Sequence, residues 1–332
     1  MASRRVNSMA AVNLDIVVVG ELNVDLILDR LQGFPALGKE KLADAMTLTM
    51  GSSSAIFASN ASALGTRVGF LGKVGEDSFG DLVLSSLQKR GVDISHIIRQ
   101  KTFGTGATVI MNLPEDRAML TYKGAMDDFR LGDIDWPYVQ TARHLHLSSY
   151  FLQAGLKPDC ATLFQKAKGL GLTTSLDTNW DPDEKWDRTL FEVFPFVDIF
   201  LPNEEEALRI SGCATAESAL ETLAQHVKTV VIKLGKNGAM GREGETLHRT
   251  QGYQVNFVDA VGAGDSFDAG FVFSWLRGGD LSRSLEFGTK CGALSVTKAG
   301  GTGAFTSPEQ IKRDLQAYFG DSSADVEKRK GS

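Results

Sequence analysis

The feature that most constrains the fold of this chain is a series of short, continuous apolar runs, each of which ends in a polar cluster. The runs occupy residues 14–20, 173–177, 196–202 and 229–235, and the clusters that follow them read ELNVD, TNWDPDE, NEEEA and KNGAMG. Short runs rich in valine and isoleucine are typical of strands that are buried on both faces of a parallel sheet. Helical patterns lie between them, as at residues 79–91 and 217–227. The alternation predicts an α/β fold with a doubly wound, mostly parallel sheet that is flanked by helices.

The polar clusters also predict where a ligand binds. In open parallel sheets, ligands bind outside the carboxyl ends of the strands. Because each cluster follows directly on an apolar run, the clusters should meet at one edge of the sheet. The sequence therefore favours a single shared site at that edge.

Two segments interrupt the alternation and predict a second, smaller sheet. Residues 104–125 have the pattern of a β-hairpin with PED at its turn, and residues 38–51 are extended and only weakly helical. Long irregular insertions are more often functional than not. We therefore expect residues 31–50 and 101–125 to form a small β-sheet lid over the site, although a pair of surface excursions would also fit. The main domain is expected over residues 13–318, with flexible tails at residues 1–12 and 319–332.

The composition excludes several classes of function. The net charge is −6 and no basic patch dominates, which argues against nucleic acid as a partner. The three cysteines lie far apart and fit neither a disulfide framework nor a metal clip, so we expect a reducing compartment. No apolar run approaches the roughly 20 residues that span a bilayer, and no secretion signal stands at the start. We expect a cytoplasmic protein that does not bind membranes.

The stretch DAVGAGDSFDAG, at residues 259–270, combines a glycine turn with an acid at the start of a helical pattern. An apolar stripe begins at Phe267, which places Asp265 in the first turn of the helix. An acid there is stabilised by the helix dipole and caps free N–H groups. The same N–H groups could instead bind a phosphate, because Gly262, Ala263 and Gly264 carry almost no side chain. The turn alone leaves both interpretations open.

A hydrolase is the minor alternative. The residues GDS at 264–266 resemble the nucleophile block of a class of serine esterases. In those enzymes the block lies near the N-terminus and a late histidine follows it, whereas here the last histidine, His248, precedes the block. The pattern G-x-S-x-G is absent around Ser266. The chain also lacks the P-loop pattern G-x-x-x-x-G-K-[ST].

Taken together, these residues resemble the ribokinase-like (phosphofructokinase-B) family of carbohydrate kinases. The C-terminal signature of that family matches Asp259 and the stretch GAGD at 262–265, and its N-terminal signature matches residues 51–65 and 70–80. NEEE at 203–206 matches the family's N-x-x-E motif. Three residues depart from the pattern. Ala260 stands where the family usually has Thr or another β-branched or small polar residue, Ser52 replaces the usual second glycine, and Ile56 replaces the asparagine of ribokinases proper. The resemblance covers roughly residues 13–316.

The resemblance implies a set of site residues. Asp265 would be the catalytic base, and the N–H groups of Gly262, Ala263 and Gly264 would form an anion hole. Glu206 would act on Mg²⁺ through water, and Asp259 would take part in a monovalent-cation (K⁺) site with the loop at 298–305. The residues expected to bind the sugar are Asn23, Asp25, Gly51, Ser52 and Asn179. The residues expected to bind ATP are Asn203, Lys233, Gly235 and Gly238.

The implied function is transfer of the γ-phosphate of ATP to a primary hydroxyl of a small sugar, as in fructokinases or ribokinases. A nucleoside kinase or a 2-keto-3-deoxygluconate kinase of the same family is the nearest alternative, and Ile56 favours a hexose such as fructose. A non-catalytic sugar- or nucleotide-binding module would normally lose the aspartate or the anion-hole glycine, and both are present. The lid would also offer a surface for a homodimer.

Overall fold

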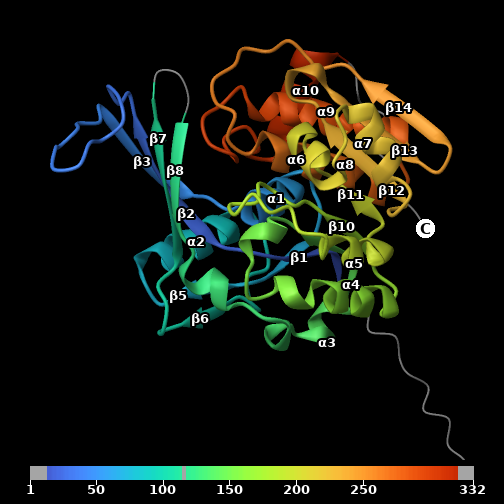
Figure 1. The fold of residues 1–332 in the computed structure, drawn as a ribbon, viewed down its shortest axis with the longest axis horizontal. Helices are drawn as coiled ribbons and strands as arrows, with labels where there is room; N and C mark the ends of the chain where they lie inside the picture. The colour runs from blue at the N-terminus through green and yellow to red at the C-terminus, as the bar shows by residue number, and fades with distance from the viewer. Residues whose placement is uncertain (1–12, 114–116, 321–332) are drawn as a thin grey trace, which may run out of the picture.

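An eight-stranded sheet forms the centre of the molecule in the computed structural model, which describes residues 13–113 and 117–320 (Figure 1). The six strands from β12 to β4 run parallel, and β13 and β14 add an antiparallel edge. The strand order is β14 (Thr246–Thr250), β13 (Ala239–Glu243), β12 (Thr229–Lys233), β11 (Ile199–Phe200), β10 (Thr173–Leu176), β9 (Ala142–Leu147), β1 (Leu14–Val19) and β4 (Val68–Leu71). The predicted doubly wound, mostly parallel sheet is confirmed.

Helices cover both faces of this sheet, and the alternation of side chains along each strand explains why. In β1, Ile16 and Val18 belong to one apolar core, while Val17 and Val19 belong to the other. The first core is covered by α1 (Ser53–Ala63), α2 (Ser78–Lys89), α8 (Ala263–Leu276), α9 (Leu281–Ser295) and α10 (Pro308–Phe319). The second core is covered by α3 (Trp136–Val139), α4 (Cys160–Gly169), α5 (Leu190–Val193), α6 (Glu204–Ser211) and α7 (Ala216–Leu223).

Most elements lie where the apolar pattern predicts them, and the differences are at their ends. The run at 196–202 contributes only the two residues of β11, and its first residue belongs to the 3₁₀ turn η5 (Phe194–Phe196). The helix predicted at 217–227 is α7, which ends at Leu223. A two-stranded sheet of β5 (Lys73–Gly75) and β6 (Ile98–Gln100) lies beside the main one. No helix in the part of the chain that is described has the length and apolar character needed to cross a membrane.

A second sheet of four strands stands apart from the main body (Figure 1). Its order is β3 (Ala45–Met50), β2 (Asn23–Asp29), β7 (Gly106–Asn112) and β8 (Arg117–Tyr122). The first lid segment was expected at residues 31–50. In the structure the small sheet begins earlier, because its central strand β2 starts at Asn23. The PED turn of the predicted hairpin and the two expected tails, apart from residues 319 and 320, lie outside the described residues. Residue 319 is the last residue of α10.

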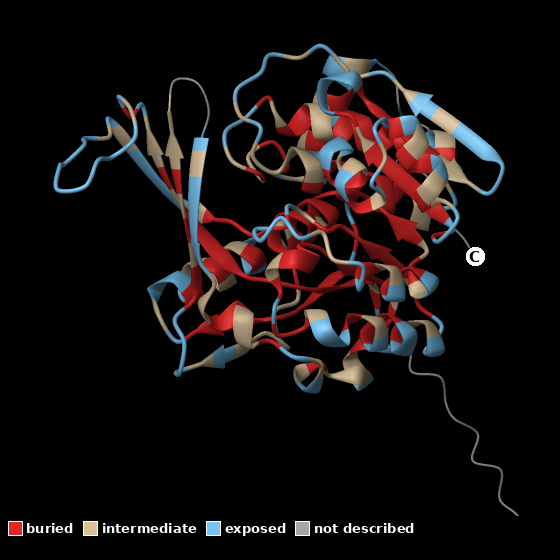
Figure 2. Cartoon of the chain, viewed as in Figure 1, coloured by how far each residue is buried: buried red, intermediate tan, exposed pale blue. Residues whose placement is uncertain are grey.

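The two faces of the small sheet differ in chemistry. Strand register places Asn23, Asp25 and Ile27 on one face together with Thr108, and these residues are buried. The opposite face is apolar and lies open or half-buried, and Figure 2 shows tan and pale blue over most of β3 and β8. This second face, called the outer apolar face below, comprises Leu26, Leu28, Met46, Leu48, Val109, Met111, Leu120 and Tyr122.

The close packing of α8 against α9 can be tested by a substitution at Gly270. A Cβ atom added at Gly270 would lie 2.6 Å from Sγ and 2.8 Å from Cβ of Cys291. We expect Gly270→Ala to lower the free energy of unfolding by about 1–3 kcal/mol, the usual range for overpacking. That loss outweighs the gain of about 1 kcal/mol in helix propensity.

The matched control is Gly169→Ala at the end of α4, where an added Cβ has no neighbour within 4 Å. This variant should be as stable as the parent or more stable. Urea denaturation of both variants measures the difference. A Gly270→Ala protein as stable as the parent would contradict the packing of α8 on α9.

Candidate active site

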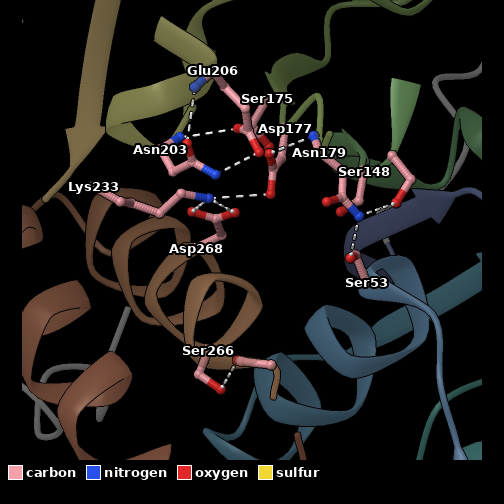
Figure 3. Close-up of polar contacts among 12 residues, drawn as sticks. Ser53, Ser148, Ser175, Asp177, Asn179, Asn203, Glu206, Lys233, Ser266 and Asp268 are labelled. Atoms are coloured by element: carbon pink, nitrogen blue, oxygen red, sulfur yellow. Dashed lines mark hydrogen bonds and ion pairs between the residues drawn. The ribbon is translucent and has the colours of Figure 1, made fainter. Parts of the chain in front are cut away.

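The site lies where several strands of the large sheet end and three helices begin. Lys233 is the last residue of β12, and Asp177 follows β10 directly. Helices α1, α6 and α8 begin around the same place, and the side chains in Figure 3 come from all of these elements. Because helix N-termini carry free N–H groups and partial positive charge, the arrangement is suited to binding anions.

The glycine turn before α8 has the conformation that an open anion site requires. Gly262 has φ 71°, and a Cβ atom there would lie 2.5 Å from Cα of Gly301, so only glycine fits. At Gly264 an added Cβ would find only Lys233 nearby, with Nζ at 3.5 Å. Ala263 is the first residue of α8. The turn itself carries no side chain larger than a methyl group, and residues 262–264 are half-buried.

Asp265 lies in the first turn of α8 and is buried. Burial raises the pKa of its carboxyl group to about 7, and the negative charge of Asp177 adds to the rise. The positive charge of Lys233 acts in the opposite direction. A carboxylate with a pKa near neutral pH is a much better proton acceptor than an ordinary aspartate.

Lys233 forms an ion pair with two carboxylates (Figure 3). Its Nζ lies 3.1 Å from Oδ2 of Asp177 and 3.0 Å from Oδ2 of Asp268. Although burial opposes the charged form, these two carboxylates raise the pKa of Lys233 above its usual range. The prediction that Lys233 binds ATP stays a prediction, and its ammonium group pairs with Asp177 and Asp268 in this structure. Asp268 was not singled out from the sequence, although it lies one helical turn after Asp265 and so on the same side of α8.

Asn203 and Glu206 form a capping box at the start of α6. The backbone N–H and the side-chain amide of Asn203 donate to the two carboxylate oxygens of Glu206, at 3.0 and 2.6 Å, and Glu206 N–H donates back at 2.9 Å. Burial, followed by the charge of Asp177, raises the pKa of Glu206. Among residues 13–113 and 117–320, no group of three His, Cys, Asp or Glu residues is arranged to hold a metal ion directly. A carboxylate already bound in this way fits a role on Mg²⁺ through water.

Asn23 and Asp25 lie on β2 of the small sheet, not in a loop after the first strand. The amide of Asn23 donates to Asp25 Oδ1 at 3.1 Å and to Thr108 Oγ1 at 3.2 Å. Burial raises the pKa of Asp25 to about 6. Gly51 faces this carboxylate, and an added Cβ would lie 2.2 Å from Oδ1 of Asp25. Gly51 therefore makes the space in which Asp25 sits.

Ser52 and Asn179 both adopt left-handed backbone conformations, with φ 71° and 56°. Ser52 caps α1, and its hydroxyl donates to the carbonyl of Glu21 at 2.6 Å. The side-chain amide of Asn179 donates to the hydroxyls of Ser53 at 3.1 Å and Ser149 at 3.2 Å. Both residues thus hold neighbouring parts of the site together.

The turn between β12 and β13 and the side chain of Asp259 are also anchored. Gly235 and Gly238 have φ 56° and 92°, and a Cβ at Gly238 would lie 2.2 Å from the carbonyl oxygen of Thr250. Asp259 accepts hydrogen bonds from Val261 N–H at 3.0 Å and from Gly300 N–H at 2.9 Å. Asp259 therefore joins the loop at 298–305 to the segment that leads into the glycine turn.

Two expectations change with these contacts. Ile56 is buried against Gly262 and Gly301, so it packs beneath the glycine turn, and its presence gives no reason to favour a hexose.

Ser266 is buried as well, and its hydroxyl donates to the carbonyl of Gly262 at 2.7 Å and accepts from Asn60 at 2.9 Å. These bonds make Ser266 a structural residue at the start of α8 and remove the basis for a hydrolase.

Sequence reasoning also missed Glu21, a buried carboxyl group two residues after β1. No motif marks it, and the only signal in the sequence is its place in the polar cluster after the first strand.

Known carbohydrate kinases are similar to this chain over most of its length. The model of the pfkB family carbohydrate kinases matches residues 13–308. A 5-dehydro-2-deoxygluconokinase from Geobacillus thermodenitrificans is 27% identical over 323 residues, which cover 91% of this chain and 93% of that protein. A 2-dehydro-3-deoxygluconokinase from Bacillus subtilis is 30% identical over 267 residues, which cover 76% of this chain and 82% of that protein.

The fold has a counterpart among solved structures. A candidate ribokinase II from Escherichia coli, solved in complex with ATP and Mg²⁺, superimposes with a TM-score of 0.80 at 25% identity. The match covers 92% of this chain and 99% of that one. This chain therefore belongs to the PfkB family of carbohydrate kinases and is a sugar kinase.

Proposed function

We propose that this kinase, a single domain over residues 13–318, transfers the γ-phosphate of ATP to a primary hydroxyl group of a small sugar. The observation that carries the proposal is the position of Asp265. It is a buried carboxylate in the first turn of α8, next to a turn of two glycines and an alanine, and its pKa is raised to about 7. A proton acceptor beside an anion site is what transfer to an alcohol requires.

In the proposed reaction the sugar oxygen forms a bond to the γ-phosphorus as the bond to ADP breaks. The hydroxyl proton passes to Asp265. The N–H groups of residues 262–265 stabilise the charge on the transferring phosphoryl group. Because the transition state is loose, the protein contributes mainly alignment and charge stabilisation.

The nucleotide would lie on the turn between β12 and β13. Gly235 and Gly238 bring the backbone close to it, and Asn203 lies beside that turn, since it forms an isolated bridge with Lys233. When bound, Mg²⁺ would neutralise charge on the phosphates, and Glu206 would orient it through water. The link between Asp259 and Gly300 is the place where we expect K⁺ to act.

The sugar would lie between the small sheet and the start of α1. Asn23 and Asp25 would bind its hydroxyl groups from β2, with Gly51 packed against the carboxylate of Asp25, which would make the small sheet a lid over the sugar. Ser52 and Asn179 would line the site at the start of α1 and after β10. The two relatives reported above are named for keto sugar acids, so such acids are substrate candidates beside fructose, ribose and nucleosides. We place the reaction in the cytoplasm, because Cys160, Cys213 and Cys291 are free thiols.

The decisive variant is Asp265→Asn. The substitution keeps the size of the side chain but removes the proton acceptor, so turnover should fall by about 100-fold or more, the range for loss of a general base. Sugar-dependent ADP release is measured over a panel of ketoses, aldoses, keto sugar acids and nucleosides, with and without K⁺. Binding of the sugar, followed by calorimetry, should persist in the variant. Turnover close to that of the parent would disprove the role of Asp265.

The pH profile gives an independent check. Only the ionised form of Asp265 can accept a proton, so kcat/KM of the parent should decline as the pH falls through about 7, where the pKa of this group lies. The decline should approach about tenfold per pH unit, as expected for one essential base. A rate that stays constant from pH 8 to pH 5 would argue that no group of raised pKa takes the proton.

We further propose that two copies associate through the outer apolar face. Met46 and Leu120 are 66% and 69% exposed in the single chain, and an open apolar face on a sheet is a common site of association. Leu120→Lys should convert the dimer into a monomer in sedimentation velocity measurements. Leu247→Lys is the control, because Leu247 is also well exposed but lies on β14 at the edge of the large sheet. A dimer that survives Leu120→Lys would rule this interface out.

A further inference from the structure

Asn60 is a buried polar residue of α1 that lies next to the glycine turn. Its side-chain amide donates to Ser266 Oγ and to the carbonyl oxygen of Gly301, both at 2.9 Å. Asn60 and Ser266 are both fully buried. Because a carbonyl oxygen can only accept a hydrogen bond, the nitrogen and not the oxygen of the Asn60 amide must face Gly301. The orientation of this side chain is therefore fixed by its partners.

Ser266 connects Asn60 to the glycine turn. Its hydroxyl donates to the carbonyl oxygen of Gly262 at 2.7 Å, so the same hydroxyl accepts from Asn60. The backbone N–H of Ser266 donates to that carbonyl oxygen as well, at 2.9 Å. A chain of hydrogen bonds thus runs from Asn60 through Ser266 to Gly262. Hydrogen bonds in such a chain polarise and strengthen one another.

The glycine turn needs contacts from outside α8 to keep its conformation. Gly262 is the N-cap residue of α8, with φ 71°, and it makes no side-chain capping bond. Glycine adopts many backbone conformations, so this turn does not hold one of them by itself. Gly301 lies directly against the turn, since a Cβ at Gly262 would be 2.5 Å from its Cα. Asn60 therefore binds the segments on both sides of the contact, the start of α8 and the loop at 298–305.

Ile56 and Asn60 make their contacts from the same side of α1, because they lie one helical turn apart. Ile56 packs against Gly262 and Gly301, while Asn60 bonds to Ser266 and to the carbonyl of Gly301. Figure 3 shows Ser266 at the place where α8 approaches α1. Helix α1 thus supplies both an apolar contact and a pair of hydrogen bonds to the segments that form the turn.

We infer that Asn60 is a positioning residue for phosphoryl transfer, which acts through Ser266 and Gly301 to hold the backbone N–H groups of residues 262–265 in the arrangement that binds the transferring phosphoryl group. The inference rests on the proposed function. Donors that are fixed in advance stabilise developing charge without any rearrangement during the reaction. A displacement of about 1 Å in such a group can cost about 100-fold in rate.

The test compares Asn60→Ala with the parent, using the sugar that the panel identifies. Alanine suits a helix and removes the amide, so the turn loses its hydrogen bonds to α1. We expect kcat to fall by about 10- to 100-fold, the cost of displaced donors. The KM for the sugar should not change, because the turn acts on the phosphoryl group in the transition state.

Inhibition by ADP, Mg²⁺ and aluminium fluoride separates positioning from general damage, because aluminium fluoride imitates the transferring phosphoryl group. In Asn60→Ala this inhibition should weaken by a factor similar to the fall in kcat, while ADP alone binds as in the parent. The control is Ser59→Ala, at a buried hydroxyl of the same helix with no hydrogen-bond partner within the described structure. This variant should match the parent in both measurements.

Ser266→Ala breaks the same link from its other end. Asn60→Ala and Ser266→Ala combined should lose less than the product of the two single losses, because both substitutions act on one turn. Losses that multiply in full would overturn the inference. A parent-like kcat in Asn60→Ala would overturn it, as would a lower kcat with unchanged inhibition by aluminium fluoride. If Asn60→Ala does not fold, the same two measurements on Ser266→Ala decide.

NMR of protein labelled with ¹⁵N-glycine needs no substrate. The backbone amide signals of Gly262 and Gly264 should shift in Asn60→Ala and stay in place in Ser59→Ala. Unmoved signals in Asn60→Ala would overturn the inference. If no sugar is turned over, the proposed function fails, while these signals still decide whether Asn60 sets the conformation of the turn.

Discussion

The ion pair of Lys233 with Asp177 and Asp268 is the interaction on which the rest of the site depends. It joins the end of β12, the end of β10 and the first turns of α8 through one buried ammonium group. Breaking a buried pair by removing one partner leaves an uncompensated charge, which is strongly destabilising. The pair therefore ties α8 to the sheet and holds the glycine turn beside the end of β12.

Around this ion pair the site is short of positive charge. Asp177, Glu206, Asp265 and Asp268 lie around Lys233, and burial together with mutual repulsion raises the pKa of Glu206, Asp265 and Asp268. This arrangement gives Asp265 a proton affinity that an exposed aspartate lacks. In the proposed reaction, Asp265 would take the proton, and the backbone N–H groups of the glycine turn would stabilise the charge of the phosphoryl group.

Much of the fold followed from local pattern. Strands buried on both faces must be apolar throughout, so the runs at 14–20 and 229–235 predicted β1 and β12 closely. The start of α8 was predicted equally well, because a glycine turn followed by an acidic residue and an apolar stripe is typical of the N-terminus of a helix. The early start of β2 was not predictable in this way. Asn23 and Asp25 interrupt its apolar pattern, and the pairing with β3 and β7 involves residues far along the chain.

The parts of the site that escaped prediction depend on contacts between distant segments. The partners of Lys233 come from residues 56 and 35 positions away. The burial of Ile56 against Gly301 depends on a loop near the end of the chain. Glu21 is surrounded by serines from two other segments, and its sequence neighbours give no hint of them. Local sequence patterns do not reveal such contacts, because the segments meet only after the chain has folded.

The central claim, transfer of a phosphoryl group to a primary alcohol, is tested most directly by the structure of the product. A ³¹P NMR spectrum without proton decoupling, recorded after reaction of ATP with the sugar, reports which hydroxyl carries the phosphate. The account predicts a phosphomonoester signal that is split by the two protons of a CH₂ group. Accumulation of inorganic phosphate alone, with no sugar ester, would contradict it.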